Sequence, residues 1–379
     1  MWPFARLRAL ALAAGLWLPT LHCWFEAPPR AELAERLSRA ALGQRPESIA
    51  ALRQANAEWD FMGRTYFVLA LANIALRDPT RAQTSIRTID QILTETLELE
   101  ERHGMRYFLM PYAQAAPFVM QPERSQFLDG EIALMLGARR LVQEEPRWAA
   151  LHRERVERMI ERMERSPTLS AESYPDEAWT FCNTVALAAI AMQDALEGSD
   201  HGAFFQRWVG LAKERLVDRR SGLLISSFTL EGKRKDGPEG SSIFMAAHCL
   251  ELIDPAWASS QYQRAKVELI GVTLGFGWAR EWPSGGAGPE DIDSGPTVPL
   301  LSANAGASGM AVLGAAAFGD DETLAALLRS LELAAYPLDR AGARRYQASN
   351  AVGDAVLLYA LVQGPLWRTI QERRARGRV

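Results

Sequence analysis

The residues best suited to chemistry lie within one stretch, Ser173 to Thr184, which reads Ser-Tyr-Pro-Asp-Glu-Ala-Trp-Thr-Phe-Cys-Asn-Thr. Asp176 stands at the start of a predicted apolar helix, and Trp179 and Cys182 follow within two turns. A carboxyl group at an apolar wall resists ionisation and can act as a general acid. A cysteine beside it can act as a base or as a nucleophile. The stretch therefore predicts Asp176 and Cys182 as catalytic residues.

The same stretch also fits a purely structural role. Ser173 and Asp176 have the spacing of a helix capping box, and Pro175 suits a first helical turn. Negative charge at that position also complements the helix dipole. Capping and catalysis are therefore both open alternatives for these residues.

A second acidic site starts another apolar helix. Asp129 is predicted to be its N-cap, and Glu131 then enters a run of apolar residues, which is an unusual place for a charge. Glu131 can form a structural pair with Arg139 or Arg140 further along the helix. Alternatively, Glu131 can serve as the general acid in place of Asp176.

Other polar residues also stand where apolar helices begin. The glycine-rich acidic loop at 280–296 offers Asp293 as a metal or sugar ligand, with an Asx turn as the alternative, and it has no phosphate-binding motif. Asp60 and Arg64 are four residues apart and are predicted to pair. Tyr346 precedes the last apolar helix. The side chains predicted to contact substrate are Ser173, Tyr174, Trp179, Asp129, Asp293 and Tyr346.

These residues are positioned by helices of two alternating types. One type is apolar nearly all round and is predicted to be buried, whereas the other has one apolar stripe and a charged face. The apolar helices are predicted at 59–76, 126–142, 177–196, 241–253, 298–317 and 351–363. The amphipathic helices are predicted at 79–102, 148–164, 203–216, 260–275, 321–336 and 364–376. Short extended segments are predicted at 223–228 and 344–347.

The alternation predicts an all-α fold, an (α/α)6 barrel in which an inner ring of helices is wrapped by an outer ring. A solenoid of helix pairs is the alternative, but it would show a regular repeat period, and the sequence has none. In a closed barrel the inner helices begin around one mouth. A central cavity at that mouth is therefore the predicted ligand site.

The first 25 residues predict export from the cytoplasm. Arg6 and Arg8 precede an apolar run, which is typical of a secretory signal or a signal anchor with the body outside the cytoplasm. A buried first helix is the alternative. The predicted division is a signal or anchor at 1–25, a linker with N-terminal helices at 26–58, and the barrel at 59–379.

Composition excludes several classes of protein. The 379 residues carry a formal charge of −4, which argues against a nucleic-acid-binding surface. The 3 cysteines and 5 histidines are too scattered for a disulfide framework or a preformed zinc motif. The composition is that of an ordinary folded domain.

Taken together, the motifs resemble those of the linalool dehydratase/isomerase family. Pro175-Asp176, followed by Cys182-Asn183, is similar to that family's active-site helix start. Three interhelical turns, at 216–222, 253–256 and 319–321, resemble family turns in the same order. The resemblance covers roughly residues 60–365.

This resemblance implies an (α/α)6 barrel, export, no cofactor, and a ring-shaped homo-oligomer with the site near a subunit contact. It also implies dehydration and isomerisation of allylic terpene alcohols. The family uses two cysteines nine residues apart, and this chain has the second as Cys182 and Ser173 in place of the first. A family histidine falls at Glu131.

Three functional hypotheses follow. The first is a cofactor-free lyase or isomerase for a small, apolar, hydroxylated substrate, in which Asp176 or Glu131 protonates the leaving hydroxyl. Cys182 would then act as base or nucleophile, and Trp179 would stabilise the cation. The second is a carbohydrate-active enzyme with Asp176 and Asp293 as paired carboxylates. The third is a non-catalytic exported binding domain.

Overall fold

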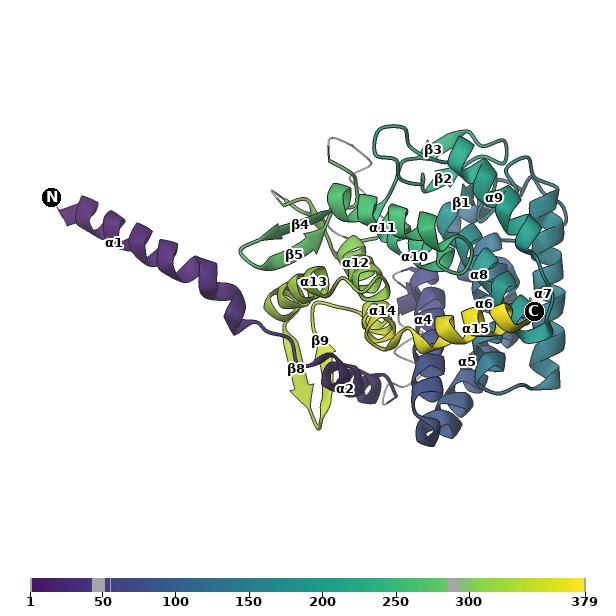
Figure 1. Ribbon diagram of the computed structural model, residues 1–379, viewed down its shortest axis with the longest axis horizontal. Coiled ribbons are helices and arrows are strands. Elements are labelled where there is room, and N and C mark those ends of the chain that lie inside the picture. Colours follow the sequence, from purple (N-terminus) through teal and green to yellow (C-terminus); the bar gives the residue numbers. More distant parts are fainter. Residues whose placement is uncertain are drawn as a thin grey trace.

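A closed ring of six inner helices forms the centre of the computed structural model, which describes residues 2–42, 52–54, 56–284, 294–295, 297–299 and 301–377 (Figure 1). Each inner helix packs against its two neighbours, and the last closes the ring against the first. The predicted (α/α)6 barrel is therefore confirmed. The inner helices are α4 (Ala57–Arg77), α6 (Gln126–Val142), α8 (Thr180–Glu197), α10 (Gly240–Leu250), α12 (Ala305–Ala317) and α14 (Ala351–Val362).

Amphipathic helices cover the ring from outside because each has a single apolar stripe to bury. They are α5 (Ala82–His103), α7 (Pro146–Glu164), α9 (Gly202–Arg215), α11 (Pro255–Leu269) and α13 (Asp321–Ala334). The sixth outer position is taken by α2 (Arg30–Leu42), which packs on α14. The prediction that 364–376 is the sixth outer helix is wrong, because α15 (Pro365–Gly377) instead packs on α4, α6 and α8.

Two of the three turns that resemble the family's are helix starts, whereas the turn at 216–222 follows the end of α9. Asp254 caps α11 by accepting a hydrogen bond from the Trp257 backbone N–H at 3.0 Å, with Pro255 in the first turn. Asp320 caps α13 in the same way, through the Thr323 N–H at 3.2 Å. These motifs therefore support the fold rather than the reaction.

Long connections join each outer helix to the next inner helix, so they gather at one end of the barrel, the mouth. Two antiparallel hairpins lie there, β4–β5 with Ile270 opposite Ala279 and β8–β9 with Pro337 opposite Tyr346. The predicted extended segments are confirmed in β2 and β9, whereas 298–304, predicted to be helical, contains part of β6–β7. The strands are β1 (Ala178–Trp179), β2 (Ser227–Phe228), β3 (Arg234–Asp236), β4 (Ile270–Thr273), β5 (Phe276–Ala279), β6 (Thr297–Val298), β7 (Ala303–Asn304), β8 (Pro337–Arg340) and β9 (Ala343–Tyr346). Three 3-10 helices complete the connections, η2 (Pro79–Arg81), η3 (Met105–Phe108) and η4 (Pro111–Gln114).

The N-terminal helix α1 (Trp2–Trp17) projects away from the barrel and continues as the 3-10 helix η1 (Leu18–Trp24) (Figure 1). Within the described residues, Phe4–Trp24 is the one stretch long and apolar enough to cross a membrane, and none of it is buried. A signal sequence and a membrane anchor both have these properties.

A buried hydrogen-bonded chain marks the end of the barrel opposite the mouth. His248, in the last turn of α10, contacts the Glu251 carboxylate through Nδ1 at 2.5 Å and the Tyr359 hydroxyl through Nε2 at 2.7 Å. The Trp367 ring of α15 stacks on His248 with centroids 4.4 Å apart. These contacts fix α15 across this end of the ring.

Replacing Tyr359 with phenylalanine is expected to lower the free energy of unfolding by about 1–3 kcal/mol, because His248 Nε2 then loses its buried partner. Chemical denaturation would measure the loss. Tyr336→Phe is the matched control, because Tyr336 is exposed and should unfold like the parent. Equal stability of the two variants would contradict this role for the buried chain.

Candidate active site

Glu131 is a buried carboxyl group on the inner ring. It lies in the second turn of α6, and its Oε2 accepts a hydrogen bond from Thr65 Oγ1 of α4 at 2.6 Å. The pKa of Glu131 is raised from 4.5 to about 8, mainly by burial; the Thr65 hydrogen bond opposes the rise, and the Glu58 carboxylate contributes to it. Glu131 therefore carries a proton at neutral pH and can donate it.

The Cys182 thiol lies on the neighbouring inner helix, in the first turn of α8. Gly130 lets the two helices approach closely, because a Cβ at this position would lie 3.3 Å from the Cys182 carbonyl oxygen. Burial holds the pKa of Cys182 well above its usual range, the nearby Ser173 hydroxyl acts against the rise, and the charge of Glu131 adds to it. The thiol is therefore protonated at neutral pH.

Ser173 is held against Cys182 by its backbone. Its carbonyl accepts a hydrogen bond from Ser125 Oγ at 2.7 Å, and its N–H donates to the Glu177 carbonyl at 2.8 Å. Asn183 clamps the same segment through the backbone of Ala171. The Ser173 hydroxyl is buried and makes no full hydrogen bond to any described residue. It is therefore a polar group that a bound ligand could satisfy.

Two tyrosines complete the cluster. Tyr66 of α4 reaches across the ring to α12, where its hydroxyl contacts Met310 Sδ at 3.7 Å, and burial holds its pKa well above the ordinary value. The Tyr174 hydroxyl donates a hydrogen bond to Glu58 and accepts one from the Met110 N–H at 3.0 Å. The Glu58 carboxylate, held by Tyr174, also lies close enough to Glu131 to raise its pKa.

Asp176 lies apart from these groups. It is exposed, has a φ of 50°, and sits in a tight turn closed by hydrogen bonds between Tyr174 and Glu177. The predicted capping box is wrong, because α8 begins only at Thr180, after this turn and a short strand. A left-handed conformation suits an aspartate in a turn.

The remaining predicted substrate contacts are placed elsewhere or outside the described residues. The Trp179 indole N–H donates to Glu177 at 2.6 Å, so its polar edge faces the same turn. The Tyr346 hydroxyl donates to Glu332 at 2.6 Å, in a cluster formed with the β8–β9 hairpin. Asp293 lies outside the described residues.

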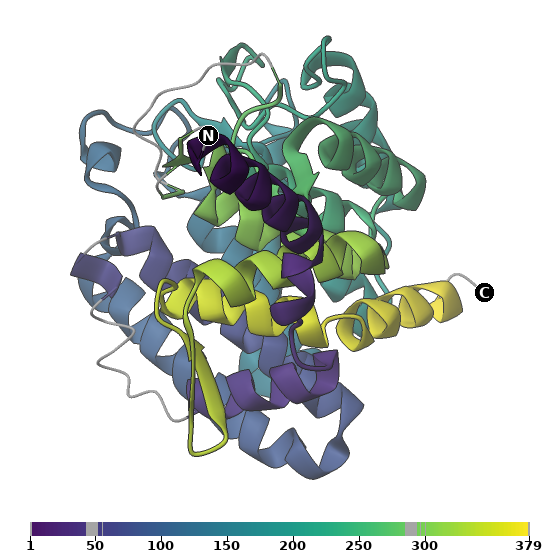
Figure 2. The ribbon, with the colours of Figure 1, turned by 90° about the vertical axis from the view of Figure 1, so that its left-hand side faces the viewer.

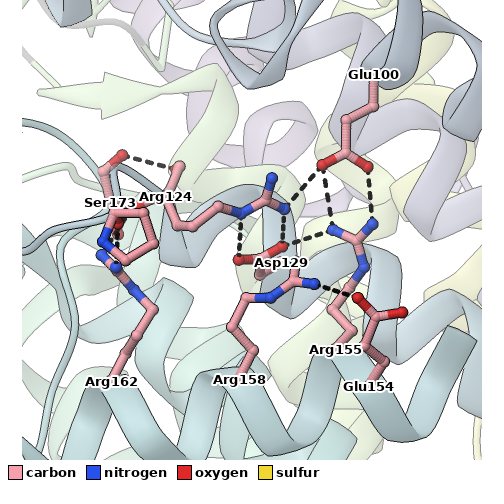
Figure 3. A network of polar contacts seen from close by, with 10 residues as sticks. Glu100, Arg124, Asp129, Glu154, Arg155, Arg158, Arg162 and Ser173 are labelled. Atoms are coloured by element: carbon pink, nitrogen blue, oxygen red, sulfur yellow. Dashed lines mark hydrogen bonds and ion pairs between the residues drawn. The ribbon is translucent and has the colours of Figure 1, made fainter.

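Asp129 belongs to a network of ion pairs (Figure 3). Arg124 and Arg155 both donate to its carboxylate, the latter at 2.5 Å, and both also contact Glu100. Asp129 is therefore not free to bind a ligand. It is not an N-cap either, because α6 begins three residues earlier, after Ser125.

The predicted arginine partners of Glu131 are also engaged elsewhere. Arg139 pairs with Asp90 and Arg140 with Glu144, at 2.5 and 2.9 Å. The expected structural pairing of Glu131 with either arginine is therefore wrong. The predicted Asp60–Arg64 pair is confirmed at 2.9 Å.

Glu58, Thr65 and Tyr66 are the cluster members that sequence reasoning did not assign to the site. All three lie on α4, and the available signal was a set of polar side chains in the N-terminal half of an otherwise apolar helix. Among the described residues, no three His, Cys, Asp or Glu side chains come together to hold a metal ion. The arrangement instead offers a neutral carboxylic acid, a thiol and hydroxyl groups in a buried setting.

Comparison with known proteins adds a family and a fold. The family model of linalool dehydratase/isomerase matches residues 132–352, more than half of the chain. Unsaturated glucuronyl hydrolase from Bacillus sp. GL1, responsible for the degradation of glycosaminoglycan, is similar with a TM-score of 0.51 and 12% identity over 81% of this chain and 86% of that one. A GH76 alpha-mannanase from Bacteroides thetaiotaomicron gives a TM-score of 0.47 and 10% identity over 82% and 87%. At 12% identity the similarity to the hydrolase shows the (α/α)6 fold alone.

Proposed function

Because the chain belongs to the linalool dehydratase/isomerase family, we propose that it is a cofactor-free lyase or isomerase for a small, apolar, hydroxylated, terpenoid-like molecule. The observation that carries this proposal is Glu131, a buried carboxyl group whose pKa of about 8 keeps it protonated beside Cys182. Breaking a carbon–oxygen bond needs such an acid, because hydroxide is a poor leaving group and water is a good one.

In the proposed reaction, Glu131 gives its proton to the substrate hydroxyl. The carbon–oxygen bond breaks, water leaves, and an allylic cation faces the new Glu131 carboxylate. For dehydration, that carboxylate takes a proton from the neighbouring carbon, which forms the alkene and restores the acid. For isomerisation, water returns to the other end of the allylic system and its proton goes back to Glu131. Atoms and charge balance in both directions.

Cys182 and the aromatic side chains would stabilise the cation. Since burial keeps the thiol protonated, Cys182 is a poor base, and a soft, neutral contact to the cation suits it better. Phe127 precedes Glu131 by one turn, and its ring packs edge-on against Phe61 at 5.2 Å. Aromatic faces of this kind attract a cation.

Headspace gas chromatography on a panel of allylic and tertiary alcohols tests the proposal. Cys182→Ala is expected to lower alkene or isomer formation by about tenfold, as for loss of a contact of about 1–2 kcal/mol to the cation. Asp176→Asn is the comparison, because an exposed turn residue should leave turnover near that of the parent. Thermal melts of both variants establish that they fold.

Failure of the parent on every alcohol would contradict the proposal. A glycan screen would then test the carbohydrate-active alternative, and ligand binding without turnover would favour a non-catalytic domain. Turnover lost in Asp176→Asn but kept in Cys182→Ala would return the acid role to Asp176.

We also propose that the body works outside the cytoplasm and that α1 with η1 is a retained anchor rather than a cleaved signal. Arg6 and Arg8 near the start favour this orientation. The packing of residues 22–26 on the barrel supports retention, because a cleaved signal has no need of such contacts. A homo-oligomer is a further proposal, which rests on the family alone.

A further inference from the structure

Exposed large apolar side chains gather on one side of the barrel. In the described body they are concentrated in the chain from the end of α11 to β8. This stretch includes the β4–β5 hairpin, the end of α13 and β8, and Figure 2 looks onto this side with α1 in front of the barrel. We define the docking face as Val272, Leu274, Leu333, Tyr336 and Leu338, each between 41% and 67% exposed.

The candidate membrane span is attached to this same side of the barrel, with no flexible linker between them. The Phe25 ring contacts the Phe276 ring of β5 with centroids 6.0 Å apart, and Glu26 pairs with Arg329 of α13 at 2.8 Å. His22 of η1 already lies against Gly275, at the tip of the β4–β5 hairpin. Since each residue of linker adds at most about 3.5 Å, a span that ends at Trp24 leaves the barrel no room to move away.

The span has the dimensions and the end residue of a membrane anchor. It comprises 21 residues, of which those up to Trp17 are α-helical, at about 1.5 Å per residue, and Leu18–Trp24 form a 3-10 helix, at about 2.0 Å per residue. The span is therefore about 35 Å long, enough to cross a hydrocarbon core of about 30 Å. Trp24, at the barrel end, is exposed, and tryptophan favours the membrane–water interface. Only one or two residues of chain then separate the end of the span, at the surface of the bilayer, from the contacts that hold it to the side of the barrel that carries the docking face.

We propose that the docking face rests on the bilayer that α1 crosses, with Val272, Leu274 and Tyr336 in the interfacial region. Aliphatic and aromatic side chains are favoured there, whereas in water they form an unusually concentrated apolar surface. The inference rests on the retention of α1 proposed above. The alternative is that a second copy of the chain covers this face. The span, however, already requires a bilayer at this side of the barrel, and a second copy does not explain how that bilayer meets the face.

The docking face bears on how a substrate reaches the site. The β4–β5 and β8–β9 hairpins lead into α12 and α14, so they lie at the mouth, the end where Glu131 and Cys182 occupy the N-terminal halves of their helices. An apolar alcohol partitions into lipid rather than water. A barrel held by its mouth-side hairpins therefore takes its substrate from the bilayer.

Lipid-phase quenching in proteoliposomes tests the proposal on the full chain. The label is an environment-sensitive fluorophore on a single introduced cysteine, Leu274→Cys, in a Cys23→Ser background, since Cys182 and Cys249 are buried. Leu151→Cys is the matched control, because Leu151 is also a partly exposed leucine and belongs to α7, which lies on the other side of the barrel from α1 (Figure 1). The vesicles contain phosphatidylcholine and phosphatidylglycerol, with or without a nitroxide on the acyl chain.

The expected result is a blue-shifted emission at position 274 and several-fold stronger quenching there than at 151. Equal quenching at the two positions would overturn the proposal. A blue shift at 274 that lipid nitroxide does not quench, and that grows with protein density, would assign the face to a second copy instead. A mass of the membrane-extracted chain that lacks the first 24 residues would also overturn it, and the alcohol assay would be unaffected by that result.

Discussion

Replacing Glu131 with glutamine is expected to lower turnover by about 10²- to 10⁴-fold while leaving the barrel folded, because the proposed proton donor is lost. Glutamine has the same shape, and its amide oxygen can still accept the hydrogen bond that Thr65 donates at 2.6 Å. Headspace analysis of product at saturating and limiting alcohol would separate kcat from kcat/KM. The loss should appear in both, as for an interaction made in the transition state.

The pH dependence of the parent gives the same residue a second signature. The acid form is the active one, so kcat/KM should fall as the pH rises through about 8, the pKa of Glu131. Stability should change in the same direction. Between about 4.5 and about 8 the folded protein keeps a proton that the unfolded chain has released, so the free energy of unfolding falls across this window.

Glu131→Gln removes that part of the slope. The melting temperature of the variant should therefore depend less on pH across the window, and the variant should be more stable than the parent above pH 8. Burial also raises the pKa of Asp354, to about 6, so Asp354 contributes to the pH dependence of stability in the same window. This contribution is the same in parent and variant, and it cancels when the pH dependence of one is subtracted from that of the other. Full activity in the glutamine variant would remove Glu131 from the mechanism, and an unchanged slope would show that its carboxyl group is not held neutral.

Hydrophobic periodicity predicted the inner ring well, because a helix that is buried on every side is apolar on every side and therefore appears in the sequence as an almost unbroken apolar run. The prediction at 126–142 matches α6 at both ends. The outer ring was harder, because an apolar stripe shows that a helix is covered but does not show by which partner. Thus α15 had the pattern of an outer helix, yet it crosses the end of the ring, and α2 occupies the outer position.

The site was predictable where its residues lie on adjacent inner helices near their starts. Cys182 and Glu131 meet that condition, Ser173 lies in the loop before α8, and the structure brings the three together. Thr65 comes from 66 residues earlier in the chain than its partner, a relation that no local spacing reveals. Asp176 misled because an acid beside a proline fits a helix start and a turn equally well, and here the turn is adopted.

Asp129→Ala is expected to destabilise the barrel by about 2–3 kcal/mol, because it removes the more deeply buried of the two carboxylates that Arg155 and Arg124 share and leaves them Glu100 alone. Asp129 is 1% exposed, so water cannot replace it. Glu154→Ala is the matched control in the same network (Figure 3). It removes an exposed i,i+4 pair with Arg158 and should cost less than about 0.5 kcal/mol.

Acid unfolding gives the second measurement on this network. The two arginines hold the pKa of Asp129 below 3.8 against the opposing effect of burial, so its contribution is present above that pH and is lost as the pH falls through the folded pKa. The variant should therefore show a smaller acid-induced loss than the parent. Because Asp129 precedes Glu131 by two residues, the network also fixes the turn of α6 that presents the proposed acid. A variant as stable as Glu154→Ala would mean that packing alone positions α6, and the ion network would then have no part in shaping the site.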